Sequence, residues 1–201
     1  EELAPDAIQQ VIELIEANDY DLVIEFGSGT STLLMAQALT KVQQRTGKHC
    51  TQVAFEHLSQ YHAKTLALLK QNQRQDAVQL IHAPLVPYTA PNGMAFSYYD
   101  CETALHHLAW QHPPRSRILV VVDGPPGATN PLARYPALHH LWPQFKDAHF
   151  DFLMDDYIRQ DEKETIERWR DELISHDLEP QLTTLKFEKE AALLSVKTAK
   201  A

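Results

Sequence analysis

The chain has 201 residues, of which 44% are hydrophobic and 22% are charged. This length and composition suit one sizeable hydrophobic core, and they exclude a disordered protein. A formal net charge of −9 argues against a general nucleic-acid-binding protein, because neutralising phosphates requires a dense surface of Lys and Arg. We therefore expect a single domain over residues 1–201 that has small partners and binds no nucleic acid.

Two further features indicate the compartment. The sequence contains no run of about 18 apolar residues, and its acidic start, Glu1 and Glu2, differs from the basic start of a signal peptide. The cysteines, Cys50 and Cys101, form neither metal-ligand spacing nor a disulfide framework, as expected in a reducing compartment. The sequence thus predicts a cytoplasmic protein without a membrane partner, and it leaves open whether that protein is a monomer or a homo-oligomer.

Short apolar segments alternate with segments of helical periodicity along the chain. Helices are predicted at residues 5–18, 33–39, 61–69, 102–110, 135–142 and 161–175, and strands at residues 21–26, 52–56, 78–82, 117–123 and 150–154. Residues 84–100 contain three prolines and several aromatic residues, and are predicted to form an irregular insertion. Residues 182–187 and 192–196 are predicted to pair as a terminal hairpin within 182–197.

Strands that alternate with helices imply a Rossmann-like, doubly wound α/β fold. We expect a mostly parallel seven-stranded sheet, to which the C-terminal hairpin adds antiparallel strands. Segment 117–123 (R-I-L-V-V-V-D) is apolar without alternation, which is typical of the buried centre of a parallel sheet. In such sheets, ligands bind beyond the carboxyl ends of the strands.

The first predicted strand runs into a glycine turn, E-F-G-S-G-T-S at residues 25–31. Two glycines let the chain turn sharply from strand to helix and let a ligand approach the backbone. A nicotinamide-cofactor fingerprint would have a third glycine where Thr32 stands, and a carboxylate beside the helix N-terminus suits an ammonium or sulfonium better than a pyrophosphate. The predicted cofactor-binding residues of this turn are Glu25, Gly27, Ser28, Gly29, Thr30 and Ser31.

A second carboxylate, Glu56, closes the next predicted strand and is followed by His57. The two oxygens of a carboxylate at this place can accept hydrogen bonds from both hydroxyls of a ribose. Together with the glycine turn, Glu56 and His57 therefore predict a site for a nucleoside-type cofactor.

These motifs resemble those of the class I S-adenosylmethionine-dependent methyltransferases, over residues 20–197. The resemblance is carried by E-F-G-S-G-T at 25–30, F-E at 55–56, V-V-D-G-P-P at 121–126 and the terminal hairpin. It implies that the cofactor is S-adenosylmethionine, that the glycine turn holds its methionine portion and that Glu56 holds its ribose. It further implies that His82 and Ala83 flank the adenine and that Asp123 also contacts the cofactor. Many members have a third glycine where Ser31 stands.

Three acidic residues follow neighbouring predicted strands: Asp123 ends the fourth, and Asp155 and Asp156 end the fifth. Carboxylates brought together away from water repel one another, which invites a divalent cation or raises their pKa values. The pattern D-G at 123–124 with D-D-Y at 155–157 is similar to metal-dependent O-methyltransferases of the macrocin and catechol types.

That similarity implies that Asp123, Asp155 and Asp156 are catalytic and hold Mg²⁺ beside the acceptor hydroxyl. Macrocin-type enzymes often have a further acid where Pro125 stands, so the general base is left open. The residues alone equally allow Asp155 and Asp156 to cap the following helix, or to pair with Arg134 or Arg159.

The leading hypothesis is an S-adenosylmethionine-dependent methyltransferase that methylates a hydroxyl of a small molecule or saccharide. Insertion 84–100 is expected on the acceptor side, where Tyr98, Tyr99 and Asp100 form either a pocket wall or a hydrophobic plug. The alternatives are an N-methyltransferase, a nicotinamide-dependent oxidoreductase and a non-catalytic nucleoside-cofactor-binding domain.

Overall fold

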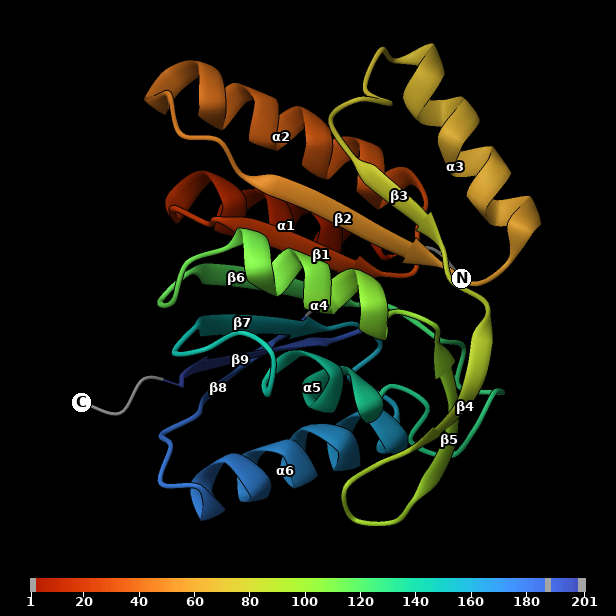
Figure 1. The fold of residues 1–201 in the computed structure, drawn as a ribbon, viewed down its shortest axis with the longest axis vertical. Helices are drawn as coiled ribbons and strands as arrows, with labels where there is room; N and C mark the ends of the chain where they lie inside the picture. Colours follow the sequence, from red (N-terminus) through yellow and green to blue (C-terminus); the bar gives the residue numbers. More distant parts are fainter. Residues whose placement is uncertain (1–2, 187–188, 199–201) are drawn as a thin grey trace.

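The computed structural model describes residues 3–186 and 189–198, and it contains a seven-stranded sheet in the order β3-β2-β1-β6-β7-β9-β8 (Figure 1). The strands are β1 (Leu22–Phe26), β2 (Thr51–Glu56), β3 (Gln79–His82), β6 (Arg117–Val122), β7 (His149–Met154), β8 (Gln181–Leu185) and β9 (Ala191–Lys197). Neighbours from β3 to β7 are parallel, whereas β9 runs antiparallel to β7 and β8. The predicted Rossmann-like sheet with a C-terminal antiparallel hairpin is confirmed. The end of its predicted first strand, at residue 187, lies outside the described residues.

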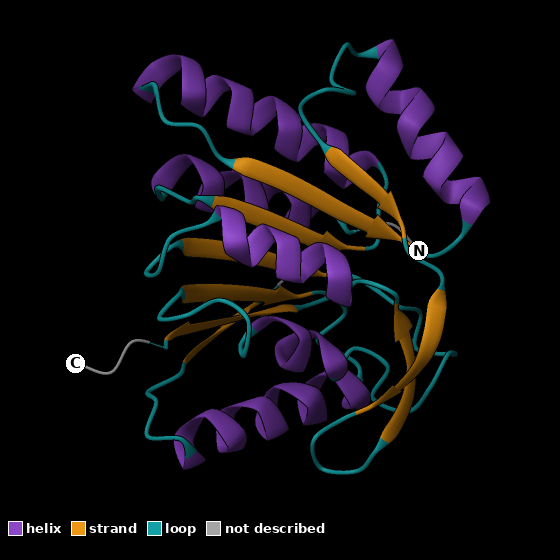
Figure 2. Ribbon diagram, viewed as in Figure 1, coloured by secondary structure: helices purple, strands orange, loops and turns teal. Residues whose placement is uncertain are grey.

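Helices cover both faces of this sheet (Figures 1 and 2). The helices are α1 (Pro5–Ala17), α2 (Thr30–Thr46), α3 (Ser59–Gln71), α4 (Glu102–Gln111), α5 (Pro136–Leu141) and α6 (Gln160–Ser175). Along β6, Val121 packs with residues of α1 and α2, whereas Val120 packs with residues of α4, α5 and α6. Burial on both faces explains why this strand is apolar without alternation. None of the described helices is both long and apolar enough to span a bilayer.

The segment predicted to be irregular, residues 84–100, instead forms an antiparallel hairpin, so that prediction was wrong. Strands β4 (Leu85–Thr89) and β5 (Ala95–Tyr99) pair as a separate two-stranded sheet beyond the carboxyl ends of the main strands (Figure 1). Pro87, opposite Ser97, suggested a loop because proline has no N–H to donate. A two-stranded ribbon tolerates it, because each strand has an outer edge that needs no ladder hydrogen bond.

Strand register places the predicted site residues in one row. Phe26 is aligned with Phe55 on one side and Val122 on the other, and Val122 is aligned with Met154. The residues that follow these four in the chain are Gly27, Glu56, Asp123 and Asp155. The glycine turn, the ribose-type carboxylate and the acidic residues therefore lie along the same edge of the sheet.

A polar network ties the strands together nearer their amino ends. Asp151, in the middle of β7, is 3% exposed and accepts hydrogen bonds from Tyr20 Oη (2.7 Å), Ser195 Oγ (2.6 Å) and Arg117 Nη2 (3.3 Å). Burial alone would raise the pKa of Asp151, but the hydrogen bonds and the nearby His149 hold this pKa well below its usual range. The ionised carboxylate therefore stabilises the fold.

We predict that Asp151→Asn lowers the free energy of unfolding at neutral pH by about 1.5–3 kcal/mol, the range for hydrogen bonds to a charged group. Because the folded state depresses the pKa of Asp151, its contribution is present above about pH 4 and disappears as the pH falls further. Urea unfolding at neutral pH and near pH 3 measures both effects, and the difference between wild type and variant should shrink in acid.

The control for this prediction is Tyr20→Phe, which removes one donor and leaves the carboxylate of Asp151 in place. We expect a smaller loss, about 1 kcal/mol, with the acid dependence retained. Equal stability of wild type and Asp151→Asn at neutral pH would show that the network contributes nothing.

Candidate functional site

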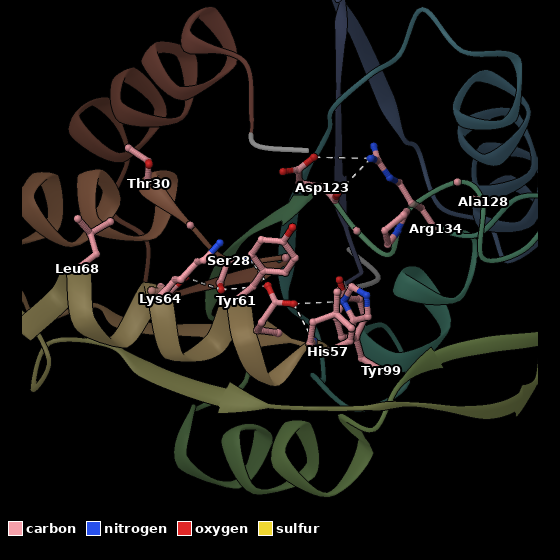
Figure 3. Close-up of a pocket in the computed structure, with 18 of the residues that line it drawn as sticks. Ser28, Thr30, His57, Tyr61, Lys64, Leu68, Tyr99, Asp123, Ala128 and Arg134 are labelled. Carbon is pink, nitrogen blue, oxygen red and sulfur yellow. Dashed lines mark hydrogen bonds and ion pairs between the residues drawn. The ribbon is translucent and has the colours of Figure 1, made fainter.

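A cavity of about 780 Å³ lies at the carboxyl edge of the sheet (Figure 3). Its volume is within the range of about 300–1,000 Å³ that is usual for small-molecule and cofactor sites. The predicted site residues that line it are Gly27, Ser28, Gly29, Thr30, Glu56, His57 and Asp123. Residues predicted from separate motifs therefore meet around one space.

The glycine turn lets the backbone of β1 turn into α2 at the cavity wall. Gly27 has a φ of +100°, a backbone conformation that side-chain-bearing residues rarely adopt, and its N–H donates to the carbonyl oxygen of Phe55 (3.0 Å). The N–H of Gly29 donates to Oγ1 of Thr32 (3.0 Å) in the first turn of α2. Because Gly27 and Gly29 line the cavity and have no side chains, the main chain of this turn faces it.

Glu25 forms hydrogen bonds with the first residues of α2, just after the turn. It is 1% exposed, and its carboxylate accepts hydrogen bonds from Ser31 Oγ and from Thr32 Oγ1 (2.6 Å). Burial raises the pKa of Glu25 to about 7 despite these two hydrogen bonds. Neither Glu25 nor Ser31 lines the cavity, so direct contact of either residue with a cofactor stays a prediction.

Glu56 presents an oriented carboxylate at the end of β2. Oε2 accepts hydrogen bonds from Ser28 N (3.2 Å) and Ser28 Oγ (3.1 Å), Oε1 accepts one from Leu58 N (3.0 Å), and His57 Nδ1 lies 3.3 Å from Oε1. Burial would raise the pKa of Glu56, but His57 and the Leu58 N–H outweigh it, and the pKa lies below its usual value. The carboxylate is therefore ionised at neutral pH and can accept further hydrogen bonds.

The residues predicted to flank an adenine are absent from the cavity wall. His82 is exposed and its ring centroid lies 5.8 Å from that of His62, while Ala83 is buried and donates its N–H to the carbonyl oxygen of Glu56 (2.8 Å). Neither lines the cavity. Their assignment to the adenine stays a prediction without support from the shape of the cavity.

Sequence reasoning missed the contribution of α3. Leu58 precedes this helix, and Tyr61, Lys64 and Leu68 lie along it; all four line the cavity (Figure 3). Tyr61 is 46% exposed, and Lys64 Nζ lies 4.9 Å from the centre of its ring. The spacing of three and four residues between Tyr61, Lys64 and Leu68 places them on one helix face, a signal present in the sequence.

Asp123, Asp155 and Asp156 converge as predicted. One ligand oxygen from each of the three carboxylates lies within 4.8 Å of the others. Burial raises the pKa of Asp123 and that of Asp155, and the neighbouring carboxylates raise them further. Both carboxylate oxygens of Asp155 are buried and have no hydrogen-bond partner among residues 3–186 and 189–198.

Arg134 and Arg159 neutralise part of this cluster. Arg134 Nη2 lies 3.1 Å from Asp156 Oδ2 and 3.6 Å from Asp123 Oδ1, and Arg159 Nη1 lies 3.0 Å from Asp156 Oδ2. The alternative of arginine pairing is therefore present at Asp156. With Asp155, Arg134 forms a hydrogen bond to the main chain and not to the carboxylate: Arg134 Nη1 donates to the carbonyl oxygen of Asp155 (2.8 Å). Both carboxylate oxygens of Asp155 and Oδ1 of Asp123 are buried without a hydrogen-bond partner among the described residues. These oxygens form a donor set that fits a hard divalent cation.

The two interpretations of the hairpin β4–β5, a pocket wall and a hydrophobic plug, fit different residues, while its placement on the acceptor side stays a prediction. Tyr98 is fully buried beneath the site, as a hydrophobic plug would be, whereas the neighbouring Tyr99 is also buried but lines the cavity. Asp100 is exposed and does not line it. The two interpretations of this insertion thus apply to adjacent residues.

No protein-family model and no curated protein sequence matches the chain. Solved structures match nearly all of it. The O-methyltransferase of Bacillus cereus in complex with SAH has a TM-score of 0.65 at 12% identity, covering 98% of this chain and 83% of that one. The O-methyltransferase TomG of Streptomyces achromogenes, in complex with SAM, has a TM-score of 0.64 at 12% identity, covering 99% and 82%. A methyltransferase of Geobacter sulfurreducens has a TM-score of 0.59 at 12% identity, covering 98% and 80%. The chain therefore has the Rossmann-like α/β fold of these methyltransferases.

Proposed function

We propose that this chain is an S-adenosylmethionine-dependent methyltransferase that methylates a hydroxyl of a small molecule or saccharide. The observation that carries the proposal is the single cavity in which the glycine turn, Glu56 and Asp123 meet. The shared fold, and the SAM and SAH bound to two of the similar structures, support it. A cytoplasmic location belongs to the same proposal.

On the donor side, the residues fit a cationic nucleoside ligand. The ionised Glu56 can accept hydrogen bonds from ribose hydroxyls, while the main chain at Gly27 and Ser28 allows close approach. The cavity wall holds the acidic Glu56 and Asp123 together with the basic Lys64, Arg134 and Arg159, so it can complement both the cationic groups and the carboxylate of this ligand. When bound, S-adenosylmethionine supplies an electrophilic methyl group. Loss of that methyl group leaves S-adenosylhomocysteine, whose sulfur is uncharged, and this product serves as the ligand in the binding experiments below.

On the acceptor side, an alcohol is a weak nucleophile until it loses its proton, and the acidic cluster would promote this loss. Burial and the neighbouring carboxylates raise the pKa of Asp123, so ionising the whole cluster is costly unless a cation compensates the charge. Mg²⁺ held by Asp123 and Asp155, with Asp156 beside them, would lower the pKa of an acceptor hydroxyl. An N-methyltransferase would not need this cluster.

The primary test is calorimetric titration of the chain with S-adenosylhomocysteine and, separately, with NADH, each with and without Mg²⁺. We expect micromolar binding of S-adenosylhomocysteine and none of NADH. Binding of NADH alone would favour the oxidoreductase alternative, and binding of neither ligand would overturn the proposed function.

The role of Glu56 is tested by Glu56→Gln, which keeps the size of the side chain and removes its charge. We expect affinity for S-adenosylhomocysteine to fall at least about tenfold, because hydrogen bonds to a charged acceptor contribute about 1.5–3 kcal/mol. The matched control is Glu102→Gln, an exposed residue outside the cavity wall. Unchanged affinity in Glu56→Gln, with normal thermal unfolding, would remove Glu56 from the donor site.

The metal assignment is tested by Asp155→Asn, whose effect should be confined to the acidic cluster. We expect calorimetric Mg²⁺ binding to be lost while affinity for S-adenosylhomocysteine changes less than about twofold, because Asp155 does not line the cavity wall that holds Glu56. Asp171→Asn, an exposed change on α6, should bind Mg²⁺ like the wild type. Failure of the wild type to bind Mg²⁺, with S-adenosylhomocysteine already bound, would contradict the assignment.

A further inference from the structure

Two adjacent tyrosines at the end of β5 carry buried hydroxyl groups without partners. Tyr98 is fully buried and Tyr99 is 1% exposed. Neither hydroxyl oxygen has a hydrogen-bond partner within the described part of the chain. A buried polar group without a partner costs free energy, so each of these hydroxyls requires an explanation.

The surroundings of the two hydroxyls differ. The ring of Tyr98 stacks on that of His140, with centroids 5.3 Å apart and an interplanar angle of 12°, and Tyr98 does not line the cavity. Tyr99 lines it, with its ring edge-on to that of His57 at 5.7 Å (Figure 3). Of these two tyrosines, Tyr99 is the one that lines the cavity, so its buried hydroxyl is the candidate for a contact with a ligand.

The position of the Tyr99 hydroxyl is fixed by the strand ends around it. Its ring lies 5.5 Å from that of Phe26 at the end of β1, and its hydroxyl is packed against Gly124, just after β6. A Cβ added at Gly124 would overlap the Tyr99 hydroxyl oxygen. The glycine therefore provides the space that this hydroxyl occupies between the ends of β1, β2 and β6.

The Tyr99 hydroxyl can act as a neutral hydrogen-bonding group and not as a base. Burial raises its pKa well above the usual value, and the carboxylates of Glu56 and Asp123 raise it further. A phenol that keeps its proton offers one donor and can also accept. Next to an anionic Glu56, it complements a ligand that presents hydroxyl or ether oxygens.

We propose that Tyr99 binds the nucleoside half of the methyl donor, through a hydrogen bond from its hydroxyl to an oxygen or nitrogen of that half beside Glu56. This assignment rests on the proposed function and adds a specificity-determining residue to it. The ring contact with His57 and the electrostatic influence of Glu56 indicate that Tyr99 lies beside the end of β2, where the ribose is expected. The hairpin β4–β5 thereby supplies part of the donor site.

The test compares Tyr99→Phe with Tyr98→Phe, which remove the same atom from two equally buried neighbours. Calorimetry measures affinity for S-adenosylhomocysteine and for 5′-methylthioadenosine, which lacks the amino-acid portion. We expect Tyr99→Phe to weaken both ligands about three- to tenfold, as loss of one hydrogen bond does, and Tyr98→Phe to weaken neither. Without ligand, both variants should unfold at or above the wild-type temperature, because each loses an unpaired buried hydroxyl.

Each other outcome has a definite meaning. Wild-type affinity in Tyr99→Phe overturns the assignment, and so does an equal loss in Tyr98→Phe, which would indicate a packing effect. A loss for S-adenosylhomocysteine alone overturns the placement at the nucleoside half. If the wild type binds neither ligand, the proposed function itself fails, whereas the preceding outcomes leave it standing.

Discussion

The candidate site depends on the parallel register of β1, β2, β6 and β7. In a parallel sheet, residues that follow aligned positions must emerge at the same edge, whatever their separation in sequence. The alignment of Phe26, Phe55, Val122 and Met154 therefore brings a glycine and three acidic residues into one row. Because these strands are buried on both faces, a shift of one residue would move charged side chains into the core. The packing that stabilises the sheet thus also fixes the site.

Carboxylates that are concentrated at one edge of the sheet repel one another. The groups that compensate their negative charge differ from one carboxylate to the next. Glu56 is stabilised as an anion by Ser28 and Leu58, whereas Asp156 is paired with Arg134 and Arg159. Asp155 has neither kind of partner among the described side chains, and its pKa is raised by burial. Glu56 and Asp156 thus already have partners for their negative charge, whereas Asp155 is the carboxylate that a proton or a cation would neutralise.

Local sequence signals were sufficient for the main sheet, because apolar strands and the glycine turn follow from short-range constraints. They failed for residues 84–100, where the prolines favour a loop and only the tertiary setting of an isolated ribbon permits Pro87 in a strand. Convergence of Asp123, Asp155 and Asp156 was predictable from strand order. Arginine pairing was an alternative for both Asp155 and Asp156, but the sequence could not show that it occurs at the side chain of Asp156 and not at that of Asp155, because this depends on where the guanidinium of Arg134 lies.

The hairpin β4–β5 shows why the choice between a plug and a pocket wall could not be made from sequence. Alternation along a strand predicts different surroundings for Tyr98 and Tyr99, yet both are buried in one core cluster and both ring centroids lie 5.5 Å from that of Phe26. The ring of Tyr99 packs on Phe26, and its buried hydroxyl lies against Gly124, which lines the cavity as Tyr99 does. Its aromatic surface therefore contributes to stability, and the proposed role in recognition depends on a single atom of a side chain that the core packs on.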